Sequence, residues 1–549
     1  MIGQPGSTNQ PAGDTPYWAD VVVIGAGFAG LYAHHRLREL GFAVCGFEAA
    51  PDVGGTWFWN RYPGARCDVE SLDYSYSFSE ALQDEWRWSE RFATQPEILR
   101  YINHVADRFD LRRDIRFERR VVRARYDGGE GVWIVETDRG EKVRCRFLIA
   151  AVGSLSLPKP PDFEGLETFE GQWAQTGLWP REGLDCEGKR VAVIGTGSSG
   201  IQSIPLLAEV AQRLTVFQRT PAYTVPALNG PIDPEFEASV RADYPAYRQQ
   251  TRKTYNGGRA PLAGTTSALA ASDDARRATF EAAWRFGCFS LLTVYRDLMT
   301  DADANAAASA FVREKLRAVV KDPLIADRLT PRGYPIGAKR LALDTGYWAI
   351  FNRPNVELVD VRAAPIEHIT ARGVCTVERE YPADVIVFAT GFDAISGPLL
   401  AMDIEGTDGR TLREVWAQGP VSYLGLMIAG FPNLFTINGP GSPSVLTNMV
   451  AAIEHHVDWI ADCLAEMRQR GLEEVQAEPA AQTAWVEEVR RIADMTLFPL
   501  AESWYMGANV PGKPRVFMAY PAGLPPYRER CEDVVRNGYS GLRFSARQA

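Results

Sequence analysis

Cysteine and histidine are scarce in this 549-residue chain, and neither occurs in a spacing that redox or metal chemistry uses. The eight cysteines are scattered singly between Cys45 and Cys531, without a CxxC or CxxxxC pair. This pattern excludes the dithiol of a flavin disulfide reductase and favours reduced thiols in a cytoplasm. The six histidines offer no ligand spacing beyond the adjacent pairs at 34–35 and 455–456, so no metal site is expected.

Long apolar runs and an excess of positive charge are also missing. The apolar run at residues 21–33 is too short to span a bilayer and contains glycines. With 59 basic and 69 acidic residues, the net charge of −10 argues against a nucleic-acid surface. We therefore expect a cytoplasmic monomer or weak oligomer without membrane or nucleic-acid partners. Residues 1–18 lack the charged and apolar regions of a signal peptide, and their polar composition predicts a disordered N-terminus.

What the chain does contain is a glycine-rich turn between a buried strand and a helix. Gly25, Gly27 and Gly30 follow a run of β-branched residues in GxGxxG spacing. In such a turn the first glycine permits the tight bend, the second lets the backbone approach a pyrophosphate, and the third lets the helix pack on the strand. A second strand ends at Glu48, where an acid should bind a ribose hydroxyl. The glycines alone are a weak signal, but with the two strands, the helix and the acid they predict dinucleotide binding.

The same pattern recurs once, with a chemical difference. Gly195, Gly197 and Gly200 repeat the spacing, but the following strand ends in Gln218-Arg219 instead of an acid. A cation at that place suits the 2′-phosphate of NADPH. Two dinucleotide sites of different chemistry predict a flavoprotein that accepts hydride from a nicotinamide.

The other segments are arranged around these two fingerprints. Residues 132–136 and 143–150 alternate like a hairpin, residues 229–331 form a helical stretch expected to cover the substrate side, and residues 445–464 predict a helix. The expected fold class is α/β, with two Rossmann-type dinucleotide-binding domains (FAD and NADP) and a helical insertion in the NADP domain. The expected segments are 19–153 and 389–549 for the FAD domain, 154–228 and 332–388 for the NADP domain, and 229–331 for the insertion.

Taken together, these stretches resemble the Baeyer–Villiger monooxygenases, single-chain flavoproteins, and most of all those that act on phenylacetone and steroids. The resemblance runs from about residue 19 to 545. It depends on the paired fingerprints and on further motifs along the chain. These motifs are Gly55-x-Trp57 with Tyr62-Pro63-Gly64 and Asp68, Phe169-x-Gly171 with Trp179-Pro180, Lys339-Arg340, and Ala389-Thr390-Gly391.

The resemblance implies an activity and its residues. FAD, NADPH and O2 would convert aryl, cyclic or steroid-like ketones to esters or lactones via a C4a-peroxyflavin, with sulfides as further substrates. Arg340 would be catalytic, holding the negative charge of the peroxide, with Asp68 beside it. Lys339 and Arg219 would bind the 2′-phosphate. The expected cofactor-binding residues are Gly25, Gly27, Gly30, Glu48, Trp57, Asp68, Tyr74, Gly195, Gly197, Ser198, Ser199, Gly200, Gln202, Arg219, Thr220, Lys339, Arg340, Met449 and Trp504. Those expected to border the substrate are Leu155, Val445, Leu446, Met449 and Met506.

One position departs from the family pattern. Gln175 stands where the family signature has histidine, and an amide can hydrogen-bond but cannot carry a charge. Because the segment links the two nucleotide domains, we interpret the role of this position as structural and conformational. Gln175 therefore affects the reaction rate and the coupling of NADPH consumption to product formation more than it affects the type of reaction. Two alternatives stay open: oxygen transfer to sulfur or nitrogen, and an NADPH oxidase that releases hydrogen peroxide.

Overall fold

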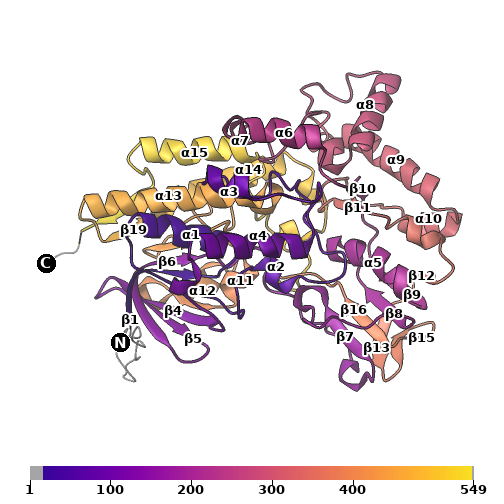
Figure 1. The fold of residues 1–549 in the computed structure, drawn as a ribbon, viewed down its shortest axis with the longest axis horizontal. Helices are drawn as coiled ribbons and strands as arrows, with labels where there is room; N and C mark the ends of the chain where they lie inside the picture. Colours follow the sequence, from indigo (N-terminus) through magenta and orange to yellow (C-terminus); the bar gives the residue numbers. More distant parts are fainter. Residues whose placement is uncertain (1–16, 547–549) are drawn as a thin grey trace, which may run out of the picture.

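The computed structural model describes residues 17–546 (Figure 1). Of the predicted disordered N-terminus, residues 1–16 lie outside the described residues, whereas Tyr17 and Trp18 begin a strand. The prediction is therefore wrong for these two residues, because they pair with Val143 and Arg144 of a neighbouring strand. None of the helices in residues 17–546 combines the length and the apolar character needed to cross a bilayer.

The first sheet has eight strands and is built from both halves of the chain. Its order is β17-β4-β5-β6-β1-β2-β3, and β18 also pairs with β6. β5 and β6 are antiparallel, which confirms the predicted hairpin, whereas β1 runs parallel to both β2 and β6. The strands are β1 (Tyr17–Ile24), β2 (Val44–Phe47), β3 (Ile115–Arg116), β4 (Val121–Asp127), β5 (Val132–Thr137), β6 (Lys142–Ala150), β17 (Asp403–Glu405) and β18 (Leu434–Thr436).

Helix α1 (Phe28–Glu39) follows the first glycine-rich turn and packs along α13 (Met449–Gln469). Gly41, at φ +75°, lies just beyond its end. α13 begins at Met449 and not at residue 445, because the side chain of Asn448 accepts a hydrogen bond from the Val450 N–H and caps the helix there. Around this sheet lie α2 (Thr56–Trp59), α3 (Glu80–Glu85), α4 (Gln95–Arg108), α11 (Gly397–Leu400), α12 (Leu412–Val415), α14 (Pro479–Asp494), α15 (Leu524–Arg536), β19 (Glu474–Ala477) and β20 (Leu542–Ser545).

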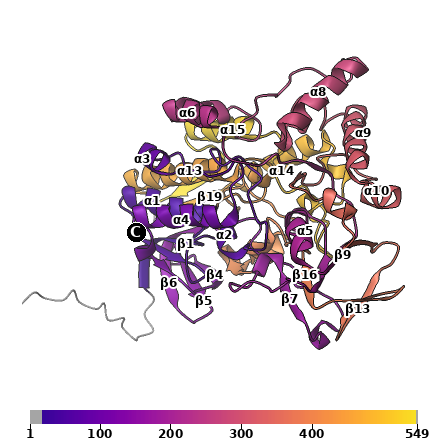
Figure 2. The same cartoon turned by 45° about the vertical axis from the view of Figure 1, so that its right-hand side comes forward.

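The second sheet has five parallel strands in the order β12-β9-β8-β16-β7. Helix α5 (Ser198–Val210) follows β8 at the second glycine-rich turn, so both fingerprints lie at the carboxyl end of a central parallel strand. The two units lie side by side (Figures 1 and 2). The strands of the second unit are β7 (Gln172–Gln175), β8 (Arg190–Ile194), β9 (Arg213–Gln218), β10 (Thr224–Pro226), β11 (Ala342–Asp344), β12 (Val356–Asp360), β13 (Ile366–Thr370), β14 (Gly373–Thr376), β15 (Glu380–Pro382) and β16 (Val385–Phe388).

Residues 229–331 are helical, as predicted, but they divide between the two units. α6 and α7 lie over the first unit, where Arg248 of α7 donates to the Asp73 carbonyl (3.1 Å) and to Ser75 Oγ (2.7 Å). α8, α9 and α10 lie on the second unit (Figure 2). They pack into its core through side chains such as Phe280 and Leu316. The insertion therefore bridges the units. Its helices are α6 (Pro234–Ala242), α7 (Tyr244–Thr251), α8 (Asp273–Phe286), α9 (Ala302–Val319) and α10 (Pro323–Leu329).

Candidate active site

The first glycine-rich turn has the geometry that a dinucleotide requires. Gly25 adopts φ +107°, and a Cβ on Gly30 would collide with the Gly25 carbonyl oxygen. The buried Glu48 carboxylate, at the end of β2, accepts hydrogen bonds from the N–H groups of Ala26 and Ala50 (both 2.7 Å). Burial raises the pKa of Glu48, and these two bonds oppose the rise. The turn, the N-terminus of α1 and the anchored acid together fit an FAD.

Two of the residues expected to line FAD lie against each other in the first unit. Trp57 belongs to the short helix α2, and its Nε1 donates to the Tyr74 hydroxyl (3.2 Å), with the two rings edge to face at 5.8 Å. Gln95 of α4 donates to the Trp57 carbonyl. This pair forms an aromatic wall of fixed orientation, suited to a planar ring system.

The second glycine-rich turn repeats the geometry of the first. Gly195 adopts φ +113°, and a Cβ there would meet the Ala389 carbonyl oxygen, whereas Gly197, before Ser198 at the start of α5, has open space around it. That space lets a phosphate approach the backbone closely. Ser199 is the second residue of α5, and its N–H belongs to the turn left without intrahelical partners.

The side chain of Gln202, on α5, connects the two units through hydrogen bonds. Its Oε1 accepts from the Tyr62 hydroxyl (2.7 Å), and its Nε2 donates to the Arg66 carbonyl (3.0 Å). A Cβ on Gly64 would also collide with the Gln202 carbonyl oxygen. The loop between α2 and Asp68 is therefore fastened to α5, and the expected contribution of Gln202 to the 2′-phosphate site stays a prediction.

Cations gather where the second unit is expected to hold a 2′-phosphate. Arg219 is exposed and lies just after the end of β9. The pKa values of Lys159 and Lys339 are both lowered, mainly by burial of their ammonium groups and next by repulsion from Arg219. Arg362 donates to Thr220 Oγ1 (3.1 Å) and repels Lys339 as well. An anion would relieve this repulsion, so the cluster fits a phosphate dianion.

Arg219, Thr220 and Lys339 were predicted from the sequence, whereas Lys159 and Arg362 were not. Both come from connecting segments without a fingerprint, Lys159 before β7 and Arg362 just after β12. The available signal was weak. Arg362 lies two residues after β12, the strand next to β9, and the carboxyl ends of neighbouring parallel strands meet at one edge of the sheet.

Arg340 and Asp68 form an ion pair between the two units. Asp68 Oδ2 accepts from Nε (3.0 Å) and Nη2 (2.6 Å) of Arg340, and Arg340 Nη1 donates to the Val445 carbonyl (2.6 Å). Burial disfavours the guanidinium charge, but Asp68 and the nearby Tyr505 outweigh it, so the pKa of Arg340 is raised. A guanidinium has five N–H donors; Asp68 and the Val445 carbonyl take three of them, and the Tyr505 hydroxyl lies within reach of the same group.

An apolar cluster adjoins this ion pair. It includes the Arg340 acceptor Val445 and the buried Tyr505, together with Trp504. Four of the five residues expected to border the substrate belong to it, namely Leu155, Val445, Leu446 and Met449. Met506 does not, although it is next to Tyr505 in the chain. The arrangement places a fixed positive charge against an apolar surface.

Gln175 is connected to the loop that contains Trp504. Its Nε2 donates to the Lys159 carbonyl, and Lys159 Nζ donates to the Asn509 carbonyl (2.7 Å). Asn509 Nδ2 in turn donates to the Phe392 carbonyl (2.7 Å), and Lys513 pairs with Asp393. The 504–513 loop is thus anchored on the segments that join the two units, and Gln175 supports one of these anchors.

The cation cluster predicts how the chain distinguishes NADP+ from NAD+. We expect NADP+ to bind more than tenfold tighter, about 1.4 kcal/mol, and Arg219→Ala or Lys159→Ala to remove most of that difference. Dissociation constants for both nucleotides, measured by titration calorimetry, test this. Arg213→Ala, at the opposite end of β9, is the matched control and should leave the ratio unchanged. Equal affinity of the unmodified chain for both nucleotides would contradict the assignment.

Comparisons with known proteins agree with this geometry. A family model described as pyridine nucleotide-disulphide oxidoreductase matches residues 19–243. A Baeyer-Villiger monooxygenase of Pseudooceanicola batsensis is 44% identical, over 95% of this chain and 96% of that protein. The solved structure of an oxidized steroid monooxygenase bound to NADP is 51% identical, with a TM-score of 0.92 over 96% of this chain and 99% of that one.

A second solved structure, cyclohexanone monooxygenase from Rhodococcus sp. Phi1 bound to NADP+, is 42% identical. Its TM-score is 0.94, and the alignment covers 97% of this chain and 100% of that one. Similarity of this extent spans both dinucleotide-binding units, the insertion between them and the residues around Arg340. The chain belongs to the Baeyer–Villiger monooxygenases, the NADPH-dependent flavoprotein monooxygenases that oxygenate ketones.

Proposed function

We propose that this chain uses FAD, NADPH and O2 to insert an oxygen atom beside the carbonyl of an apolar ketone, giving an ester or lactone. The observation that carries the proposal is the Arg340 guanidinium, which Asp68 and the Val445 carbonyl hold in a fixed orientation against an apolar cluster. Oxygen insertion develops negative charge on oxygen twice, first on the attacking oxygen and then on the former carbonyl oxygen. Such charge needs a fixed cation.

Arg340 suits this task because its charge does not depend on proton uptake. A guanidinium stays protonated at any physiological pH, and Asp68 strengthens that state here. Asp68 also fixes the direction of the planar group, since two of its N–H donors are directed at one carboxylate oxygen. The guanidinium is therefore already oriented when an oxyanion forms beside it, and the cation need not reorganise.

The apolar cluster acts by excluding water and by selecting the substrate. Leu155, Leu446, Met449 and Trp504 present carbon and sulfur surface on the side of Val445. An apolar ketone buries its own surface there, whereas water is excluded from the reacting oxygen, which limits release of hydrogen peroxide. The substrate class we assign is therefore aryl, cyclic or steroid-like ketones, with aryl sulfides as secondary substrates.

The cofactors divide between the two units. We assign residues 19–153 and 389–549 to FAD, with Glu48 at the ribose and the Trp57–Tyr74 wall at the ring, and residues 154–228 and 332–388 to NADPH. Bound FAD would supply hydride acceptance and the activation of O2. Lys159, Arg219, Lys339 and Arg362 would hold the 2′-phosphate, and the anchored 504–513 loop would place Trp504 over the nicotinamide end.

Product analysis tests the reaction type. Phenylacetone, a cyclic ketone, a steroid ketone and an aryl sulfide are each incubated with the FAD-loaded enzyme, NADPH and O2, and the ester, sulfoxide, hydrogen peroxide and NADPH consumed are measured. We expect ester or lactone from at least one ketone. Sulfoxide without any ester would favour oxygen transfer to heteroatoms, and peroxide alone would favour an NADPH oxidase.

Arg340 is the residue at which the mechanism is tested most directly. Arg340→Ala and Arg340→Lys should keep bound FAD and its reduction by NADPH, but lower ester formation by at least about a hundredfold, as loss of an oxyanion donor does. Lysine should fail because a mobile point charge replaces a planar fork. Rapid-mixing reduction kinetics and ester yield separate the two steps. Near-normal ester formation in Arg340→Ala would assign the charge-holding role to another residue.

Substitutions at position 175 test whether the connection between the two units affects the yield of ester per NADPH consumed. Gln175→His restores the family residue, and we expect it to raise the ester formed per NADPH several-fold, which corresponds to about 1 kcal/mol. Gln175→Leu keeps the size but removes the donor to the Lys159 carbonyl, so it should increase peroxide release. Unchanged reduction rate and coupling in both variants would show that residue 175 is an ordinary connecting residue.

A further inference from the structure

A β-bulge in the small antiparallel sheet of the second unit brings two consecutive side chains to one face. In the pairing of β13 with β14, Ile366 lies opposite Thr376, His368 opposite Cys375, and Ile369 opposite Val374. Glu367 is the extra residue, since the register shifts between Ile366 and His368. In a regular strand Glu367 and His368 would point to opposite faces, but a bulge opposes two residues to one partner.

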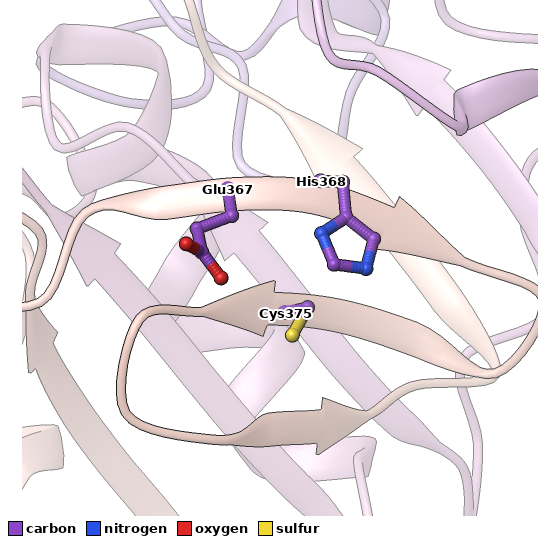
Figure 3. Close-up of side chains that lie close together, drawn as sticks. All are labelled: Glu367, His368 and Cys375. Carbon is purple, nitrogen blue, oxygen red and sulfur yellow. The ribbon is translucent and has the colours of Figure 1, made fainter.

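The burial pattern shows the result. Ile366, Ile369 and Val374 pack into the apolar cluster between this sheet and the second parallel sheet. Glu367 and His368, between the two isoleucines, are exposed and half-buried. The side chains of residues 366–369 therefore point inward, outward, outward and inward. Both polar side chains lie on the outer side of the sheet, together with the half-buried Cys375 (Figure 3).

Three different metal-binding groups converge there. A carboxylate oxygen of Glu367, a ring nitrogen of His368 and the Cys375 sulfur all lie within 4.8 Å of one another. Figure 3 shows the two side chains of β13 directed toward Cys375 on β14. Donors on one Zn²⁺ lie about 2.0–2.3 Å from it, so a modest inward rotation of the side chains, easiest for the exposed Glu367, completes the geometry.

We propose that Glu367, His368 and Cys375 form a binding site for Zn²⁺, with water as the fourth ligand. Thiolate, imidazole and carboxylate together are a donor set of zinc, whereas Mg²⁺ and Ca²⁺ take oxygen ligands. The neighbouring Glu380 already has other partners, because its carboxylate accepts from Thr370 Oγ1 (2.6 Å) and Arg372 Nη2 (2.7 Å), and we therefore assign the fourth position to water. The ion pair with Glu380 also offsets part of the positive charge of Arg372.

The site is separate from the residues assigned to the oxygenation reaction. The β13–β15 sheet lies at the lower margin of the second unit in both views (Figures 1 and 2). A bound ion would fasten β13 to β14 by side-chain ligation in addition to their backbone hydrogen bonds. Zinc should therefore stabilise this sheet locally, because any ligand that binds only the folded state does so.

Cobalt substitution provides the test, because tetrahedral Co²⁺ with a thiolate ligand absorbs in the red, where oxidised FAD does not. Tag-free holoenzyme is freed of metals, kept reduced and titrated with Co²⁺. We expect one equivalent to give these bands and Zn²⁺ to displace it. Cys375→Ser should abolish the bands, and His368→Gln should weaken binding by at least about tenfold.

The controls are residues of the same kinds elsewhere. Cys288→Ser removes another half-buried thiol, and His104→Gln removes a histidine whose Nε2 lies 3.4 Å from Glu85. Both should keep the full cobalt spectrum. Should Cys375→Ser fail to fold, Glu367→Gln at an exposed position gives the same test through zinc affinity. Bands that persist in Cys375→Ser, an unchanged zinc affinity in Glu367→Gln, or no bands in the unmodified enzyme would overturn the proposal.

Discussion

The ion pair between Asp68 and Arg340 is the contact on which the arrangement of the two units depends. Asp68 follows the first fingerprint and Arg340 comes after the insertion, yet their side chains keep only 26% and 25% of their surface exposed. Separating two such partly buried charges leaves each without its counterion, which is unfavourable. The two units must therefore meet within hydrogen-bond distance, and the bonds of Gln202 to Tyr62 and Arg66 hold the same loop in place.

The fold was predictable from sequence wherever the signal is local. The glycines at 25–30 and 195–200, the hairpin at residues 132–150 and the helical insertion all have patterns that a short window contains. The predicted start of α13, residue 445, was wrong because the side chain of one residue, Asn448, caps the helix and sets its first turn. The division of the insertion between two units could not be predicted, since it depends on contacts such as that of Arg248 with Asp73, far apart in sequence.

The residues of the candidate site also differ in whether a local sequence pattern points to them. Arg219 could be proposed from the sequence because it replaces an acid at a defined strand end. Arg340 and Asp68 could be proposed only through the family resemblance. Lys159 and Arg362 needed the folded chain, and so did the grouping of Glu367, His368 and Cys375, because a bulge has no signature in residue spacing. Histidine and cysteine spacing along the chain predicted no metal site, but cross-strand neighbours are set by register.

Lys159 lies both in the cation cluster proposed for the nucleotide phosphate and in the contacts that anchor the 504–513 loop. Its ammonium belongs to the cation cluster, while its Nζ also donates to the Asn509 carbonyl and its own carbonyl accepts from Gln175. A 2′-phosphate that attracts the ammonium would therefore pull on the same side chain that anchors the 504–513 loop. If the nucleotide binds at these cations as proposed, its binding and the position of the loop would be coupled through Lys159. The residue at 175, glutamine or histidine, would then set how firmly the backbone of Lys159 is held.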